Sequence, residues 1–317
     1  MGKLKENKSR LLSYTAFLLI IAVMVLAAEV LEEQEIIFPE VAAIAIGVFL
    51  AQTLSWKVSY IRMAVCIELC ALLGVGIVLY VPLPLWGQIL LAYLASQLVF
   101  MLSGTSFAPM ISAAVLPVLL KTNSIVYPVS ALCLTLLIIL IRRIFERRSI
   151  KSINTYNPVP LPQKKDWIVF LFRTVFVAAL APLCVAAHAK FCIAPPLLVA
   201  FTELCRPNCP AANKMTRVVL LVSLCAAFGA AVRYVLVMHF ALPLWLAALA
   251  IGLILILLVE AFKLHFPPAG AMAVLALLIP QEALPLYPLQ VLIGITVLSL
   301  AARIWAGATA ARTEHIS

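Results

Sequence analysis

Twelve apolar segments, separated by short polar loops, limit the possible folds of this chain more than any other feature. They lie at about 11–30, 37–54, 62–81, 85–102, 107–120, 125–144, 167–188, 193–204, 217–238, 242–262, 267–279 and 286–304. A helix needs roughly 20 apolar residues to cross a bilayer. The fifth and eleventh segments are short, the eighth is a further candidate, and such pieces are typical of broken or re-entrant helices. We therefore predict an all-α, polytopic transmembrane helical bundle.

The composition indicates the bilayer, and not nucleic acid, as the main partner. Hydrophobic residues make up 65% of the chain and charged residues 11%, and the mean hydropathy is +1.14, outside the range of soluble domains. The net charge of +10 does not indicate a polyanionic partner, because the basic residues fall between the apolar segments and not on one element.

The positions of lysine and arginine predict an orientation. If every segment crosses, most basic residues gather on one side, and Lys121, Lys190 and Arg233 fall on the other. The positive-inside rule then makes both termini cytoplasmic. We expect a multi-pass protein of a bacterial plasma (inner) membrane.

The second half of the sequence repeats the first. Leu-Pro-Leu-Trp occurs at 83–86 and again at 242–245, and from each Trp the same count leads to 107–109 and 266–268. Arg62 and Arg217 are each followed, at identical spacing, by a cysteine and a glycine. Coincidences at constant register predict an internal duplication.

The duplication predicts two membrane repeats, at 1–146 and 167–317, joined by a basic cytoplasmic linker at 147–166. An even number of crossings in each repeat makes the repeats parallel, as in two-lobed carriers. One chain then contains both halves of a solute path, so we expect a monomer or a homodimer.

The most unusual stretch begins at Glu260, where an apolar segment ends in charged residues and two prolines. Pro267 and Pro268 fix two φ angles and remove two donors, so one helix ends before them and another begins there. Gly270 and its alanine neighbours allow close helix packing, or leave room for a solute beside free amides. Broken helices of this kind line the substrate sites of many transporters.

Several ionisable residues near the breaks have both a functional and a structural interpretation. Glu260 and Lys263 share a helix face and could form a gate, or Lys263 could reach the lipid headgroups. His265 could bind a proton or cap a helix. Glu68 lies about 9 Å into its segment, where a carboxylate must pair, be protonated or face water. Arg62 and Arg217 lie in basic turns that could bind an anion or could follow from topology alone.

We therefore predict a solute path between the repeats, with Glu40 and Glu203 as further candidates beside the early prolines. The predicted pathway residues are Glu260, Lys263, His265, Pro267, Pro268, Gly270, Glu68, Ser106, Pro109, Arg217 and Arg62.

The second half resembles the HPP family of integral membrane proteins, which is named for a His-Pro-Pro motif followed by small residues. The stretches 194–196, 206–212 and 266–271 stand in the order that the family shows. Phe266, however, directly precedes the two prolines, and His265 lies one place earlier. A one-residue shift turns a side chain by about 100° around a helix, so His265 does not simply inherit the family histidine's role. The resemblance implies movement of small anions, since relatives in plants and cyanobacteria are associated with nitrite transport.

A weaker likeness links 38–74 to the fusaric acid resistance and aromatic acid exporter group. We therefore predict a secondary transporter or permease for a small anion or small organic acid, with aromatic acid or drug export as the alternative. A non-transporting assembly or regulatory protein is the competing class. The sequence has no nucleotide-binding loop and no common hydrolase motif, so no enzyme activity, cofactor or metal site is expected.

Overall fold

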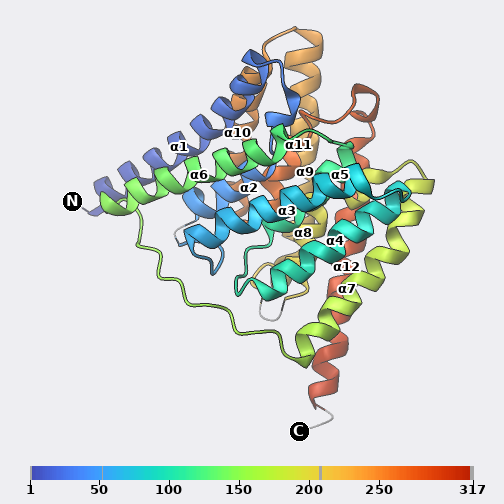
Figure 1. Ribbon diagram of the computed structural model, residues 1–317. Helices are drawn as coiled ribbons and strands as arrows, with labels where there is room; N and C mark the ends of the chain where they lie inside the picture. Colours follow the sequence, from blue (N-terminus) through green and yellow to red (C-terminus); the bar gives the residue numbers. More distant parts are fainter. Residues whose placement is uncertain (1, 52, 207–208, 315–317) are drawn as a thin grey trace.

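Twelve α-helices make up the part of the chain that the computed structural model describes, residues 2–51, 53–206 and 209–314 (Figure 1). Their bounds are α1 Gly2–Val30, α2 Glu40–Ala45, α3 Tyr60–Tyr80, α4 Leu85–Leu102, α5 Pro109–Leu120, α6 Val126–Arg147, α7 Lys164–Ala186, α8 Pro195–Leu204, α9 Met215–Val232, α10 Leu244–Phe262, α11 Pro267–Leu275 and α12 Tyr287–Glu314. The predicted all-α bundle is confirmed. Pro207 and Asn208 of the predicted 206–212 element lie outside the described residues.

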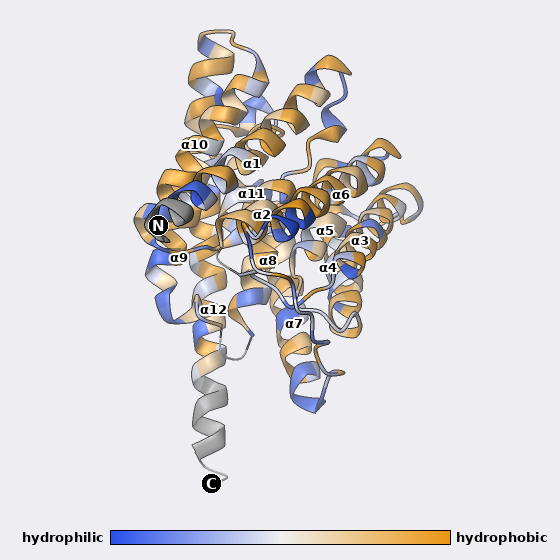
Figure 2. Cartoon of the chain, turned by 90° about the vertical axis from the view of Figure 1, so that its left-hand side faces the viewer, coloured by the Kyte–Doolittle hydropathy of each residue, from blue (hydrophilic) through white to orange (hydrophobic). Residues whose placement is uncertain are grey.

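Eight of these helices are long and apolar enough to cross a membrane: α1, α3, α4, α6, α7, α9, α10 and α12. Their shafts are hydrophobic, and hydrophilic residues gather at the helix ends and in the loops (Figure 2). Large apolar side chains such as Ile61, Tyr80 and Leu257 point outward and are 78%, 81% and 68% exposed. Such a surface is stable against lipid, and the chain is an integral, multi-pass membrane protein.

Four short helices, α2, α5, α8 and α11, fill the interior between the long ones, and nearly all of their residues are buried. Breaks in the fifth, eighth and eleventh segments were expected. The second segment, predicted as one run over 37–54, is broken as well, because α2 begins after Pro39 and passes into a π-helical turn at Ile46–Leu50. Prolines open α5, α8 and α11 in the same way, since proline is favoured in the first helical turn.

The two predicted repeats interlock and do not form separate packing units. Helix α1 packs on α10, and α7 packs on α4, so the first helix of each half lies against the other half (Figure 1). In the interior, α2 packs on α11 and α5 packs on α8. In a duplicated chain α1, α2, α4 and α5 correspond to α7, α8, α10 and α11. Replacing each helix by its counterpart gives the same pairs of contacting helices. The duplication itself stays a prediction.

The loops gather at two opposite ends of the bundle. At one end, here called the linker end, Ser9 donates to the Ile150 carbonyl and the amide of Lys57 donates to Ser106. At the other, the far end, the Glu29 carboxylate accepts hydrogen bonds from the first amides of α10, Leu244 and Trp245, at 2.6 and 2.9 Å. A carboxylate there satisfies orphan donors and complements the helix dipole, which fixes α1 against α10.

Two glycines allow the short helices to approach the long ones closely. A Cβ atom on Gly74 of α3 would lie 2.3 Å from the Ala114 carbonyl oxygen of α5. A Cβ atom on Gly229 of α9 would lie 2.3 Å from the Ala273 carbonyl oxygen of α11. Membrane helices pack through small residues for this reason.

We expect Gly74→Val and Gly229→Val each to lower the midpoint of thermal unfolding in detergent. Overpacking against backbone atoms that cannot move aside costs about 1–3 kcal/mol. Gly76→Val is the matched control, because a Cβ atom on Gly76 of the same α3 meets nothing within 4 Å. Equal melting of the Gly74 and Gly76 variants would contradict the assigned contact.

Candidate functional site

A central cavity lies where the four short helices meet. Each helix contributes two residues one turn apart: Glu40 and Ala43, Pro109 and Ser112, Pro196 and Val199, Pro268 and Ala271. The cavity measures about 10 Å³, about the space that one water molecule needs. The predicted pathway residues Pro109 and Pro268 therefore meet in the interior, at a point that is closed to any larger solute.

Glu40 supplies the one ionisable side chain among the residues that line the central cavity. It is 1% exposed, and its Oε1 accepts a hydrogen bond from the Ser112 hydroxyl. Its Oε2 has no hydrogen-bond partner among the described residues. A buried carboxylate without a cation is costly, so Glu40 is an exception in this core.

The first turns of α8 and α11 do not offer the free backbone amides that were predicted to bind a solute. Pro195 and Pro196 of α8, and Pro267 and Pro268 of α11, have no N–H, and the next amide of each helix, Leu197 or Ala269, already bonds to the turn before it. Gly270 faces α2 and the turn after it and not a solute space, since a Cβ atom there would lie 3.2 Å from the Ala42 carbonyl and 2.5 Å from Ile46 Cδ1. These helix starts favour close packing over direct hydrogen bonding to an anion.

A larger cavity, here called the basic cavity, opens at the linker end between the end of α4, the start of α7 and the linker. Its volume is about 360 Å³. Four cations line it, Lys57, Lys165, Arg173 and Arg206, against one carboxylate, Asp166. Ser106, a predicted pathway residue, also lines it and accepts from the Lys57 amide at 2.9 Å.

Arg173 is the most unusual residue of the basic cavity. It lies in the membrane-spanning helix α7, is 3% exposed, and donates from Nη1 to the Thr202 carbonyl at 3.3 Å. Its Nε has no hydrogen-bond partner, and it forms no ion pair with a described carboxylate. Arg173 is not among the residues predicted for the path, although a single arginine inside the apolar run 167–188 is the signal that points to it.

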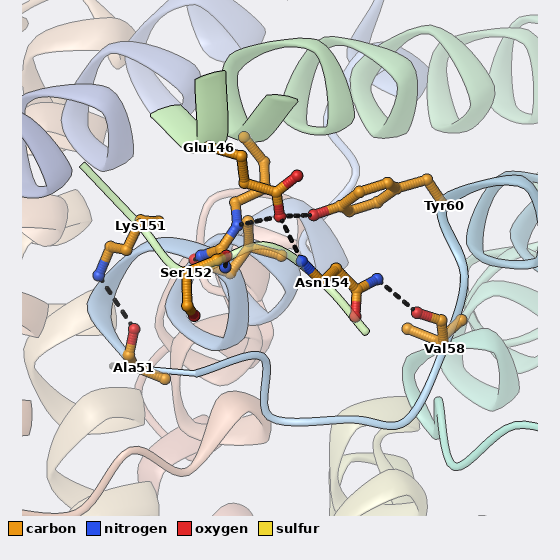
Figure 3. Close-up of polar contacts among 9 residues, drawn as sticks. Ala51, Val58, Tyr60, Glu146, Lys151, Ser152 and Asn154 are labelled. Atoms are coloured by element: carbon orange, nitrogen blue, oxygen red, sulfur yellow. Dashed lines mark hydrogen bonds and ion pairs between the residues drawn. The ribbon is translucent and has the colours of Figure 1, made fainter. Parts of the chain in front are cut away.

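A buried ion pair at the end of α6 binds the first part of the linker, and Figure 3 shows the hydrogen bonds around Glu146. Arg142 Nε lies 3.2 Å from Glu146 Oε1, and both side chains are buried. The same oxygen accepts from the Tyr60 hydroxyl and the Asn154 amide, and Arg142 also donates to the Ser152 carbonyl. Farther along the linker, residues 159–163 form one wall of the basic cavity.

The two arginines predicted for an anion site lie outside the basic cavity. Arg62 is exposed, donates to the Ser103 carbonyl and lies 5.5 Å from the ring centre of Tyr156. Arg217 is exposed at the start of α9. Neither lines the cavity, and the cations that do are Lys57, Lys165, Arg173 and Arg206.

Glu260 and His265 line a smaller cavity of about 120 Å³ at the linker end, between α1 and α10. Glu260 Oε1 accepts from the Tyr14 hydroxyl at 2.7 Å, and no ion pair joins Glu260 to Lys263 in the described chain. Burial lowers the pKa of His265, against the opposing effect of Glu260. Lys263 is exposed and ends α10 with a left-handed backbone, φ 49°, as glycine or asparagine commonly does.

Glu68 and Glu203, the other carboxyl candidates, lie away from the central cavity. Glu68 is half-buried on α3 beside Val65 and Leu69, which are 57% and 44% exposed, and it lines none of the cavities described here. Glu203 accepts from the Trp56 indole at 2.9 Å and so joins the two halves at the linker end.

A further cavity of about 260 Å³ opens at the far end and includes Glu35, Lys121 and Lys190. Burial lowers the pKa of Lys190, and the nearby Lys121 lowers it further. Burial raises the pKa of Glu35. Both shifts reduce the charge of groups at this opening.

The described residues contain no group of three or more His, Cys, Asp or Glu side chains that could hold a metal ion. No family model matches this chain, and neither a curated protein nor a solved structure matches it. The likeness to the HPP family stays a prediction.

We expect Arg142→Met to destabilise the protein by about 3–5 kcal/mol, because it leaves Glu146 buried without its cation. The double variant Arg142→Met/Glu146→Leu removes both charges and should recover most of that loss. Thermal unfolding in detergent measures both. A double variant no more stable than the single one would contradict the assigned ion pair.

Lys151, in the linker, offers a test by pH. Burial lowers its pKa to about 8, with Arg142 and Arg10 adding to the effect. The folded protein therefore releases this proton at lower pH than an unfolded chain does, and acylation of Lys151 should reach half its maximal rate near pH 8. In a short peptide that contains Lys151, the midpoint should lie at about 10.4. Mass spectrometry follows the labelling, and equal midpoints would contradict the burial of this ammonium.

Proposed function

We propose that this protein is a secondary transporter for small organic acids, with its solute path between the two halves of the chain. The basic cavity carries the proposal. Four cations and one carboxylate line it. Burying an arginine without a carboxylate partner costs desolvation free energy, and another interaction must offset that cost. A bound carboxylate would pair with Arg173 and fill its free Nε.

The shape of the cavity favours an organic acid over a bare inorganic anion. Phe100, Met101 and Val169 line it together with the cations, so an apolar body can pack beside a carboxylate held by arginine. A volume of about 360 Å³ lies in the range of small-molecule sites. The same wall favours aromatic acids as the second candidate substrate.

The closed centre supports a carrier and not an open pore. The basic cavity opens at the linker end, and the cavity with Lys121 and Lys190 opens at the far end. Between them the four short helices leave about 10 Å³. A solute could pass only after α2, α5, α8 and α11 move apart, as alternating access requires.

The test is uptake of labelled acetate, benzoate and nitrite into proteoliposomes, comparing wild type with Arg173→Met. We expect saturable uptake by wild type, and in the variant a KM for the transported acid raised about tenfold or more, because a hydrogen bond to a charged group is lost. The variant should melt no lower than wild type, because methionine removes an unpaired buried charge.

Lys164→Gln is the control, since Lys164 is exposed beside the cavity and does not line it. Uptake unchanged by Arg173→Met would refute the basic cavity as the site. No saturable uptake by folded wild type would favour the non-transporting class, and uptake of nitrite alone would favour the inorganic anions that the HPP resemblance implies.

A further inference from the structure

The carboxyl group of Glu40 lies in the interior where the four short helices, two from each half of the chain, line the central cavity. Glu40 lines this cavity, its Oε2 has no hydrogen-bond partner among the described residues, and the side chain is 1% exposed. The residues opposite, Pro196 and Val199 on α8 and Pro268 and Ala271 on α11, are apolar. The cavity has room for about one water molecule and for no ion pair.

No cation or second carboxyl faces Glu40 from the described helices packed against it. The buried residues of α1 are Ser13, Ala16, Phe17, Ile20, Ile21, Met24, Val25 and Ala28, and no lysine, arginine, histidine or carboxylic acid is among them. The π-helical turn Ile46–Leu50 has no titratable residue. From α5 the nearest polar group is the Ser112 hydroxyl, and from α6 it is the Tyr127 phenol, which donates to the Ala113 carbonyl at 3.0 Å.

An ionised Glu40 would therefore be a charge without a cation in a closed contact between the halves, with the Ser112 hydroxyl as its hydrogen-bond donor. Its desolvation costs several kcal/mol in such a place, far more than burial of the neutral acid costs. The penalty disappears if the carboxyl binds a proton, or if the helices separate and water enters. Protonation of Glu40 and closure of the central contact must favour each other.

We infer that Glu40 is the proton-binding carboxyl of this protein and carries a proton through the closed state. It binds H⁺ as a carboxylate when the short helices are apart on one side, crosses as the neutral acid, and releases the same H⁺ on the other side. This inference rests on the proposed transport function for its coupling role. It makes the carrier one that moves an organic anion together with a proton.

The other ionisable candidates fit this role less well. Glu260 is bonded to Tyr14 and lies with His265 in a cavity at the linker end, away from the central contact. Glu68 also has an Oε2 without a hydrogen-bond partner, but it is half-buried on α3 beside the exposed Val65 and Leu69 and does not line the central cavity. Glu40, in contrast, lines the central cavity between α2 and α11, so a separation of these helices would expose it to water.

The first experiment needs no substrate. Infrared difference spectra of wild type minus Glu40→Gln are recorded in lipid over the neutral pH range. We expect a positive C=O band of a protonated carboxyl that disappears on raising the pH. The same band should appear when Glu68→Gln replaces wild type in the subtraction. Ser112→Ala should keep the band and move its midpoint, because the hydroxyl bonds to Oε1. A difference spectrum with carboxylate bands only would overturn the inference.

The second experiment measures coupling with benzoate as the probe. Wild-type proteoliposomes containing a pH-sensitive dye should take up protons with benzoate faster than protein-free liposomes, whose rate reports permeation of benzoic acid through the lipid and is subtracted throughout. Glu40→Gln should lose this proton uptake and keep exchange of labelled benzoate at equal pH, since glutamine mimics the protonated acid. Glu282→Gln is the control for the loss of a carboxylate as such, because Glu282 is exposed at the far end.

The two proposals can fail separately. Proton uptake with benzoate in Glu40→Gln equal to wild type overturns the role of Glu40 even if transport is established. Failure of wild type to move any of the three anions refutes the transport function, and the infrared titration still decides whether Glu40 binds a proton. Melting curves of Glu40→Gln establish that its fold is intact before either result is read.

Discussion

The absence of water inside a bilayer governs this structure. A backbone amide or carbonyl there needs a partner from the protein itself, so four broken helices can exist only if longer helices enclose them. Eight long helices do so, and their outer surfaces are apolar. The interlocking of α1 with α10 and of α7 with α4 closes the enclosure across both halves.

Because water is absent there, each of the few charged side chains inside the bundle is energetically costly. Arg142 and Glu146 are paired and further bonded to Tyr60 and the linker, so their burial is compensated. Among the described residues Arg173 Nε and the Oε2 atoms of Glu40, Glu68 and Glu35 have no hydrogen-bond partner, and of these four residues Arg173 and Glu40 are the buried ones. A buried charge without a partner lowers the stability of the protein. Such charges are most often found where a ligand, a proton or a conformational change supplies the missing interaction. This contrast separates the structural charges from the functional candidates.

The equivalent regions of the two halves differ in chemistry. Between the end of α4 and the start of α7 lies the basic cavity, and between the end of α10 and the start of α1 lies the cavity of Glu260 and His265. If the chain arose by duplication, one half evolved toward cations and the other toward a carboxyl held by Tyr14. At the centre, Glu40 and Ser112 break an otherwise apolar ring of eight residues.

The sequence by itself determined the helical class, the membrane setting, the places of three broken segments and the breaks at the prolines, because hydrophobic length and proline geometry are local properties. It did not determine which charges meet. Arg62 and Arg217 share a motif, yet Lys57, Lys165, Arg173 and Arg206 form the basic cavity, since loops distant in the chain converge there. Only the tertiary structure decided that Glu40 faces the first turns of α5, α8 and α11, because that juxtaposition depends on how the two halves interlock.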